Sequence, residues 1–160
     1  PSATAQVTVT IPDTSLTTTL TATVSDQARV TVPAGVTFNV TDTSVATAAS
    51  GASVTVTNIV TAAAANQLRL QVQADAASFT PPSAGTSWSA TDVTWNAASW
   101  TNASGAAGTL SYASYNTVAT CTANVGSCST TGLVFSLASN TLVNRSGNHT
   151  LVIRWRVASI

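Results

Sequence analysis

Charge is the scarcest property of this sequence. Its 160 residues include no lysine and no glutamate, and only 6% are charged: five arginines and five aspartates, with a formal net charge of zero. Ordinary soluble domains carry about 25% charged residues. Without a basic patch to neutralise phosphates, we expect no nucleic-acid partner. A free monomer with so little charge should dissolve poorly, so we expect glycans or other copies of the chain to cover its surface.

Catalytic and metal-binding motifs are also missing. General acid–base catalysis needs carboxylates or histidine at controlled distances, but the five aspartates and His149 are scattered. No nucleophile elbow and no phosphate-binding glycine loop is present. Zinc would need two ligands besides Cys121 and Cys128, and the chain has one histidine. We therefore expect no enzyme, no cofactor and no metal, with a calcium site on the aspartate-bearing loops as the alternative and with His149 as a packing residue.

The sequence has no long apolar run, and its two cysteines lie close together. No run approaches the roughly 18 residues of a transmembrane helix, so we expect no membrane span. The opening Pro1-Ser2-Ala3-Thr4 is typical of a mature end after removal of a signal peptide. Cys121 and Cys128 bracket a short loop with turn residues at its centre, which predicts a disulfide closing a β-hairpin in an oxidising, extracellular compartment.

Apolar residues alternate with polar ones along much of the chain, as is typical of half-buried β-strands. In the clearest interior example, Leu68, Leu70 and Val72 face one way and glutamines and an arginine face the other. About ten short strands separated by turn signals predict one all-β domain, an antiparallel β-sandwich with immunoglobulin-like or Greek-key connections. Outside the cysteine hairpin, we expect strands over residues 7–11, 16–24, 28–32, 36–40, 53–60, 67–73, 110–112, 132–137 and 148–160.

The two ends of the chain carry the clearest alternating runs. Near the N-terminus Val7, Val9 and Ile11 alternate with threonines, and a break at Pro12-Asp13 separates them from the run at 16–24. Soluble β-proteins protect exposed sheet edges with lysine, inward-pointing charges, proline or bulges. This chain has no lysine and few other charged residues to protect its sheet edges. We therefore expect these edges to be either closed within the fold or occupied by neighbouring subunits.

Two further sets of residues are candidate sites. The first comprises the tryptophans of an aromatic segment, which either stack on sugar rings or fill the core or an interface. The second comprises four acceptor sequons for N-glycosylation, which a chain this rich in Ser, Thr and Asn also contains by chance. The tryptophans are Trp88, Trp95 and Trp100, and the sequons begin at Asn39, Asn102, Asn144 and Asn148.

Four features of the sequence are considered together: the extension at Val7, Val9 and Ile11, its break at Pro12-Asp13, the alternating C-terminal strand and the low charge. In combination they resemble a donor-strand pilin, the major subunit of chaperone–usher fimbriae or archaeal donor-strand pili. The resemblance implies that residues 1–15 are a donor-strand extension and that residues 16–160 form one immunoglobulin-like sandwich. The extension of each subunit completes the sandwich of the next, so the partners are copies of the same chain at the cell surface. The apolar face of the last strand would line the acceptor groove with Leu151, Ile153, Trp155 and Val157.

Two other functions fit the same composition. One is a secreted carbohydrate-binding or adhesive β-sandwich module that recognises host surfaces or glycans. The other is a jelly-roll capsid or surface-layer protein. Whether the donor strand acts on a neighbour or folds back on its own chain also stays open on the sequence.

Overall fold

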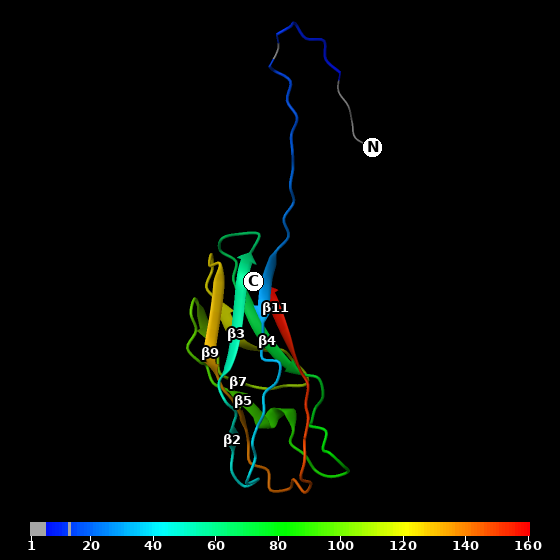
Figure 1. The fold of residues 1–160 in the computed structure, drawn as a ribbon, viewed down its shortest axis with the longest axis vertical. Coiled ribbons are helices and arrows are strands. Elements are labelled where there is room, and N and C mark those ends of the chain that lie inside the picture. Colours follow the sequence, from blue (N-terminus) through cyan, green and yellow to red (C-terminus); the bar gives the residue numbers. More distant parts are fainter. Residues whose placement is uncertain (1–5, 13) are drawn as a thin grey trace.

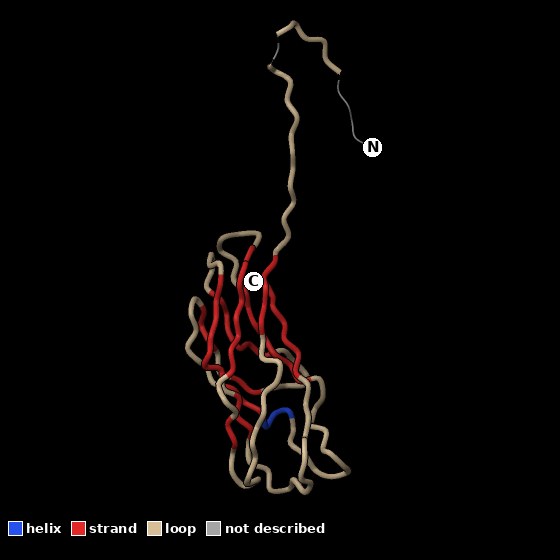
Figure 2. The backbone as a smooth tube through the Cα atoms, in the orientation of Figure 1, coloured by secondary structure: helices blue, strands red, loops and turns tan. Residues whose placement is uncertain are grey.

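The computed structural model describes residues 6–12 and 14–160 and is built almost entirely of β-strands in antiparallel sheets (Figures 1 and 2). In the described part of the chain, the single helical element is the 3-10 turn η1 (Ala90–Asp92), and no helix is long and apolar enough to cross a membrane. The strands are β1 (Gln27–Thr31), β2 (Thr47–Ala48), β3 (Ala52–Val60), β4 (Leu68–Ala74), β5 (Val93–Trp95), β6 (Ala103–Gly105), β7 (Gly108–Thr109), β8 (Asn116–Cys121), β9 (Ser127–Leu133), β10 (Phe135–Leu137) and β11 (Ile153–Ser159).

The strands form three sheets with the orders β1-β3-β9, β2-β10-β5-β7 and β11-β4-β8-β6. The longest unbroken pairing joins β11 to β4, from Ile153 opposite Ala74 to Ser159 opposite Leu68. This pairing places the odd-numbered residues of β11 on the same side as the even-numbered apolar residues of β4, because directly opposed side chains share a face. The apolar sides of both strands are thereby turned toward the interior.

One apolar core connects the sheets. Val54 and Val56 of β3 and Leu70 and Val72 of β4 are fully buried, as the alternation of these strands predicts. The core continues into the smaller sheet, where the Trp95 and Phe135 rings lie 6.2 Å apart and their strands pair. Burial of large side chains of this kind is the main favourable term in folding.

The predicted disulfide between Cys121 and Cys128 is present, but it does not close a hairpin. Cys121 ends β8 and Cys128 lies in β9, and these consecutive strands belong to different sheets. The disulfide therefore joins two sheets across the core, where both cysteines are buried. An isolated bridge pairs Thr101, just before β6, with Ser129 of β9.

Residues 6–12 and 14–26 lie outside the body in an extended tail (Figure 1). Residues 6–12 and 14–26 form no strand, so the strands expected over 7–11 and 16–24 are absent here, and the first sheet begins at Gln27 and not at residue 16. An alternating sequence forms a strand only when another strand satisfies its backbone groups, and the body supplies none to the tail. Residues 1–5 and Asp13 of the expected extension lie outside the described residues.

Candidate functional site

One long side of the body is open. β1 is the last strand of its sheet, hydrogen-bonded to β3 alone, and β11 is the last strand of its sheet, hydrogen-bonded to β4 alone. The disulfide between Cys121 and Cys128 holds the sheets together on the opposite side, where β8 and β9 lie. The disulfide therefore links two sheets on one side of the body, and the free edges of β1 and β11 lie on the other side.

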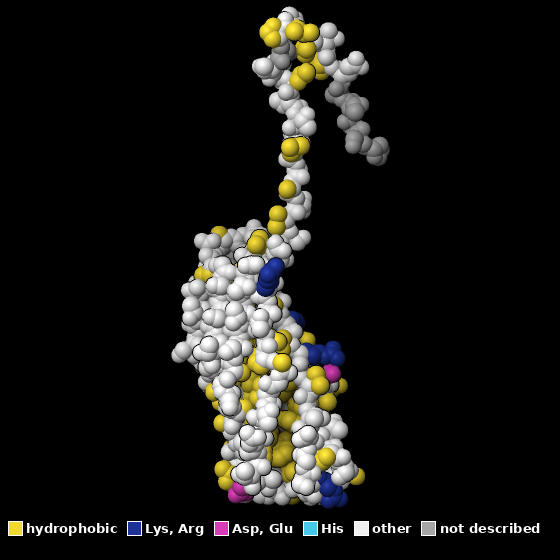
Figure 3. Space-filling view, in the orientation of Figure 1, with side chains coloured by type: hydrophobic (Ala, Val, Ile, Leu, Met, Phe, Trp, Pro, Cys, Tyr) yellow, Lys and Arg dark blue, Asp and Glu magenta, His cyan; other side chains and the backbone are white. Residues whose placement is uncertain are grey.

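An apolar groove of about 950 Å³ lies along this open side. Figure 3 shows it as a hollow in the lower half of the body with hydrophobic side chains at its base. One wall is the segment of residues 32–40 that follows β1, and the other is the segment of residues 143–155 that leads into β11. The base consists of buried core side chains, so the groove reaches the core itself; they are Trp88, Val93, Leu110, Phe135 and Leu137.

Within the part of the chain that the structure describes, the first wall has no hydrogen-bonded neighbouring strand. Residues 36–40 were expected to form a strand, and Val36, Phe38 and Val40 do pack against the core with the expected alternation. The structure assigns no strand there, and within the described residues the amides of 34–39 donate no backbone hydrogen bond. Unpaired backbone groups beside an apolar surface are costly unless a partner or water satisfies them. This wall has the side-chain pattern of a strand but lacks a neighbouring strand.

The second wall continues into β11, whose outward-facing arginines contact neighbouring side chains. Arg154 forms an ion pair with Asp75 at 2.6 Å, and the Arg156 guanidinium donates to Gln71 Oε1 at 2.6 and 3.1 Å. The Arg156 guanidinium also lies 4.5 Å from the centroid of the Tyr115 ring. These polar side chains occupy the outward face of β11, which leaves Ile153 and Trp155 facing the groove.

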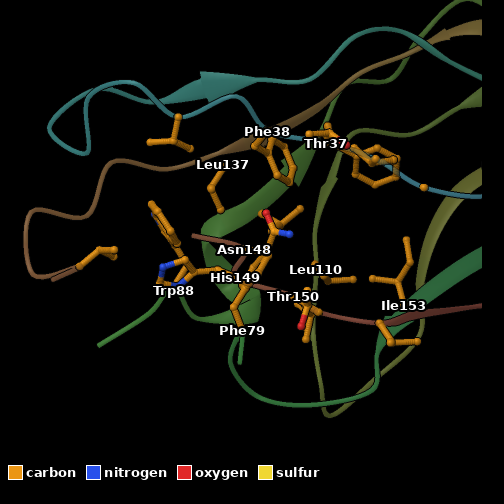
Figure 4. Close-up of a pocket in the computed structure, with 18 of the residues that line it drawn as sticks. Thr37, Phe38, Phe79, Trp88, Leu110, Leu137, Asn148, His149, Thr150 and Ile153 are labelled. Atoms are coloured by element: carbon orange, nitrogen blue, oxygen red, sulfur yellow. The ribbon is translucent and has the colours of Figure 1, made fainter. Parts of the chain in front are cut away.

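His149 lies in the groove lining next to Trp88 (Figure 4). Its Nε2 donates to the Arg145 carbonyl oxygen at 2.8 Å, and in the neutral ring its Nδ1 accepts from the Ser87 hydroxyl at 2.7 Å. The ring meets Trp88 edge-on, with centroids 5.3 Å apart. Both ring nitrogens are thus used in local contacts, and His149 acts as the packing residue that its place on the apolar face suggests.

The groove is almost uncharged. Among the described residues that line it there is no carboxylate, and Arg145 is the single arginine. The Arg145 side chain donates to the carbonyl oxygens of Ala84 and Asn144, both at 2.9 Å, so its charge is directed to the rim. The groove is therefore suited to an apolar, uncharged occupant that can also supply backbone hydrogen bonds.

The N-terminal tail, described here over residues 6–12 and 14–26, carries apolar side chains and is almost uncharged, as an occupant of this groove would need to be. Its apolar side chains are largely exposed: Val7 is 63%, Ile11 88%, Leu16 61%, Leu20 91% and Val24 68% accessible. Single exposed apolar residues are ordinary on protein surfaces, but a series along one extended segment marks a surface that binds something. The described part of the tail has a single ionisable side chain, Asp26.

The structure places three of the four expected groove residues, Leu151, Ile153 and Trp155, in the lining. Val157 lies further along β11, outside the lining, and is 36% exposed. The opposite wall at Val36, Phe38 and Val40 was not identified as a site from the sequence. Its alternation within 36–40 was the available signal, but alternation does not show which strand of a sheet lacks a neighbour.

The remaining candidates are the tryptophans and the sequon asparagines, of which Trp88, Asn144 and Asn148 also line the groove. Trp88 and Trp95 are 5% and 3% exposed, and their indole nitrogens donate to the carbonyl oxygens of Ala138 and Ala106, so their faces belong to the core. Trp100 is half-buried, and its indole nitrogen has no hydrogen-bond partner. The four sequon asparagines, Asn39, Asn102, Asn144 and Asn148, are exposed.

Across residues 6–12 and 14–160, no three His, Cys, Asp or Glu side chains come together to hold a metal ion.

Comparison of the chain with protein-family models, curated proteins and solved structures gives no match.

Proposed function

We propose that this protein is the structural subunit of an extracellular filament, in which the N-terminal tail of one copy fills the groove of the next. The body is then an immunoglobulin-like sandwich that lacks one strand, and the tail of a neighbour is that strand. One observation carries the proposal: the same chain has an apolar groove between the segment that follows β1 and the segment that leads into β11, and an exposed apolar tail that its own body does not cover.

The energetics favour this pairing. Burial of Val7, Val9 and Ile11 in a neighbour would contribute roughly 1.5–3 kcal/mol each. A strand added between two free edges gains main-chain hydrogen bonds and removes both edges from solvent. It would also accept hydrogen bonds from those amides of residues 34–39 that point toward the groove. The low charge of the body is tolerable in an assembly because neighbouring copies cover much of the apolar surface.

The placement of the tail favours a neighbour over the tail's own chain. The tail leaves the body at the start of β1 and points away from it, whereas the groove walls extend toward the other end (Figure 1). A contact between the tail of one copy and the far end of another is head-to-tail, and such contacts propagate into filaments unless a ring closes. The disulfide suits an oxidising, extracellular environment.

The decisive experiment deletes residues 1–25 and compares the variant with the full chain by negative-stain electron microscopy and analytical ultracentrifugation. We expect filaments from the full chain and folded monomers from the deletion variant. A control variant keeps residues 1–25 but scrambles their order, so that length and composition are unchanged while the alternation is lost. It should also fail to polymerise. Filaments formed without the tail would refute the proposal.

A further inference from the structure

We propose that the outward face of β4 and β11 binds an acidic polysaccharide, with Arg156 as the receptor for its carboxylate or sulfate groups. This inference goes beyond the proposed filament and does not depend on it. Side chains alternate along a strand, so this face lies on the opposite side of β11 from the groove. A tail docked in the groove therefore leaves it uncovered.

Three of the five arginines of the chain lie in a row on this face. Arg154 and Arg156 are two residues apart on β11, and the antiparallel pairing sets Arg69 of β4 opposite Ala158, two residues further along. Directly opposed side chains share a face, and alternate residues of a strand are about 7 Å apart. The row therefore presents three positively charged side chains at regular steps.

The charge of this row is only partly neutralised. Arg154 pairs with Asp75, which is the single ion pair among the residues that the structure describes. The Arg156 guanidinium is bound to the neutral Gln71, and the Arg69 side chain makes no ion pair or hydrogen bond within the described residues. Three arginines and one aspartate leave a net charge of +2 here, in a chain whose formal net charge is zero.

Arg156 is held in position before any ligand binds. Its Nε and Nη2 donate to Oε1 of Gln71, a residue that is only 8% exposed, and its guanidinium lies over the Tyr115 ring. Its Nη1 has no hydrogen-bond partner in the described part of the chain. The edge formed by Nη1 and Nη2 is thus a planar fork that matches two oxygens of a carboxylate or sulfate. A guanidinium fixed in this way loses little conformational freedom on binding.

The spacing of the arginines favours a sparsely charged polymer over a nucleic acid. Duplex DNA carries one charge per about 1.7 Å of its axis, whereas the steps of the row are about 7 Å. A polysaccharide with one acidic group on each sugar, or on every second sugar, is a closer match.

An aromatic residue lies at one end of the row. The Gln73 side chain, opposite Arg154, donates to the Tyr112 carbonyl oxygen at 2.7 Å, and Tyr112 is 56% exposed. An exposed tyrosine offers a flat apolar face and a polar hydroxyl, a combination suited to a sugar ring. Trp88 and Trp95 cannot serve in this way because their faces belong to the core.

Binding of the full chain to immobilised polysaccharides, measured by biolayer interferometry, tests the proposal. The probes are polygalacturonate, dextran sulfate and neutral dextran, with duplex DNA as a phosphate polymer. We expect binding to at least one of the two acidic polysaccharides, weaker binding as salt is raised, and none to dextran. The tighter of the two identifies carboxylate or sulfate as the recognised group. Binding to neither, or equal binding to dextran or DNA, would overturn the inference.

Matched substitutions locate the site. Arg69→Gln and its control Arg29→Gln each remove one positive charge, and Arg29 is an exposed residue of β1, which belongs to another sheet. We expect the first to weaken binding about twofold to fivefold and the second to change it little. Equal effects would indicate adsorption by net charge alone and would overturn the site.

Arg156→Lys tests the fork, because lysine keeps the charge but cannot make a planar bidentate contact. Its affinity should fall more than about fivefold, with circular dichroism to establish folding. Unchanged affinity in the folded variant would refute the role of Arg156, and Arg69→Gln, whose side chain has no partner to lose, carries the test if the lysine variant is unstable. Substitutions that altered self-association but not polysaccharide binding would make this face a contact between copies and overturn the inference.

Discussion

Cys121 and Cys128 have their Cα atoms 5.8 Å apart, and their disulfide joins the end of β8 to β9 in a different sheet. The free edges of β1 and β11 lie on the other side of the body. Because the disulfide links two sheets on one side of the body, the sheets can stay together while the other side remains available for an added strand. If the proposed filament is correct, the disulfide supports a body whose last strand comes from a neighbour.

The first prediction concerns this support. Replacement of both cysteines by alanine should lower the free energy of unfolding by about 2–3 kcal/mol, the contribution that a disulfide closing a short loop makes. Denaturant unfolding monitored by tryptophan fluorescence measures the change. Ser127→Ala, at an exposed neighbouring position, is the control and should have little effect. An unchanged unfolding midpoint would show that the disulfide does not support the body.

A second prediction compares a residue of the second wall with one just outside it. Leu151 lines the groove, whereas Leu142 is 72% exposed and does not line it. Leu151→Asp should prevent assembly because the docked strand would have to bury a carboxylate without a partner. Leu142→Asp should assemble normally. Sedimentation of the assembled fraction measures both, with circular dichroism to establish folding. Equal loss of assembly in the two variants would argue against the groove as the acceptor.

A third prediction concerns close packing near β6. A Cβ added at Gly105 would overlap the backbone of Ala97 and lie 2.7 Å from Cδ1 of Trp100, whereas one added at Gly126 meets nothing within 4 Å. Gly105→Ala should cost roughly 1–3 kcal/mol of stability because it forces the backbone apart. Gly126→Ala is the matched control and should be neutral or slightly stabilising. Denaturant midpoints that fall equally in both variants would contradict this account of the packing.

The fourth prediction concerns pH. Two hydrogen bonds to Asp42 Oδ1, from the Ser44 hydroxyl at 2.7 Å and the Ser44 amide at 2.8 Å, lower the pKa of Asp42 below its ordinary value of 3.8. A lowered pKa means that the contribution to stability is present above the unfolded-state value and is lost as pH falls through the folded-state value. A carboxyl titration by NMR should show the low midpoint, and Ser44→Ala should raise it. An unchanged midpoint in that variant would assign the shift to another cause.

Part of the strand pattern of the body could be predicted because alternation is a local property, but the strands expected at 36–40 and 110–112 are absent and the last strand begins only at Ile153. The expected strands at 28–32, 53–60 and 67–73 match β1, β3 and β4 closely, and the disulfide pairing was correct. The placement of β8 and β9 in different sheets could not be predicted, because a short loop between two strands fits a hairpin and a crossing between sheets equally well. The assignment of the disulfide to a hairpin failed for this reason.

The groove could be predicted only in part. The alternation in the last strand identified Leu151, Ile153 and Trp155, but a groove also needs an opposite wall and a base. Phe38 and Leu110 become neighbours of these residues only through long-range sheet pairing, which one sequence does not display. The tail shows the same limit, because Val7 and Leu20 have the pattern of strand residues but form a strand only when another strand pairs with them.

The most direct test of the account is a structure of the assembled filament by electron cryo-microscopy. We expect the N-terminal tail of one subunit to lie as a β-strand between residues 32–40 and β11 of the next, with its apolar side chains directed toward Leu110 and Trp155. A filament in which the groove is empty, or filled by the tail of its own chain, would contradict the account.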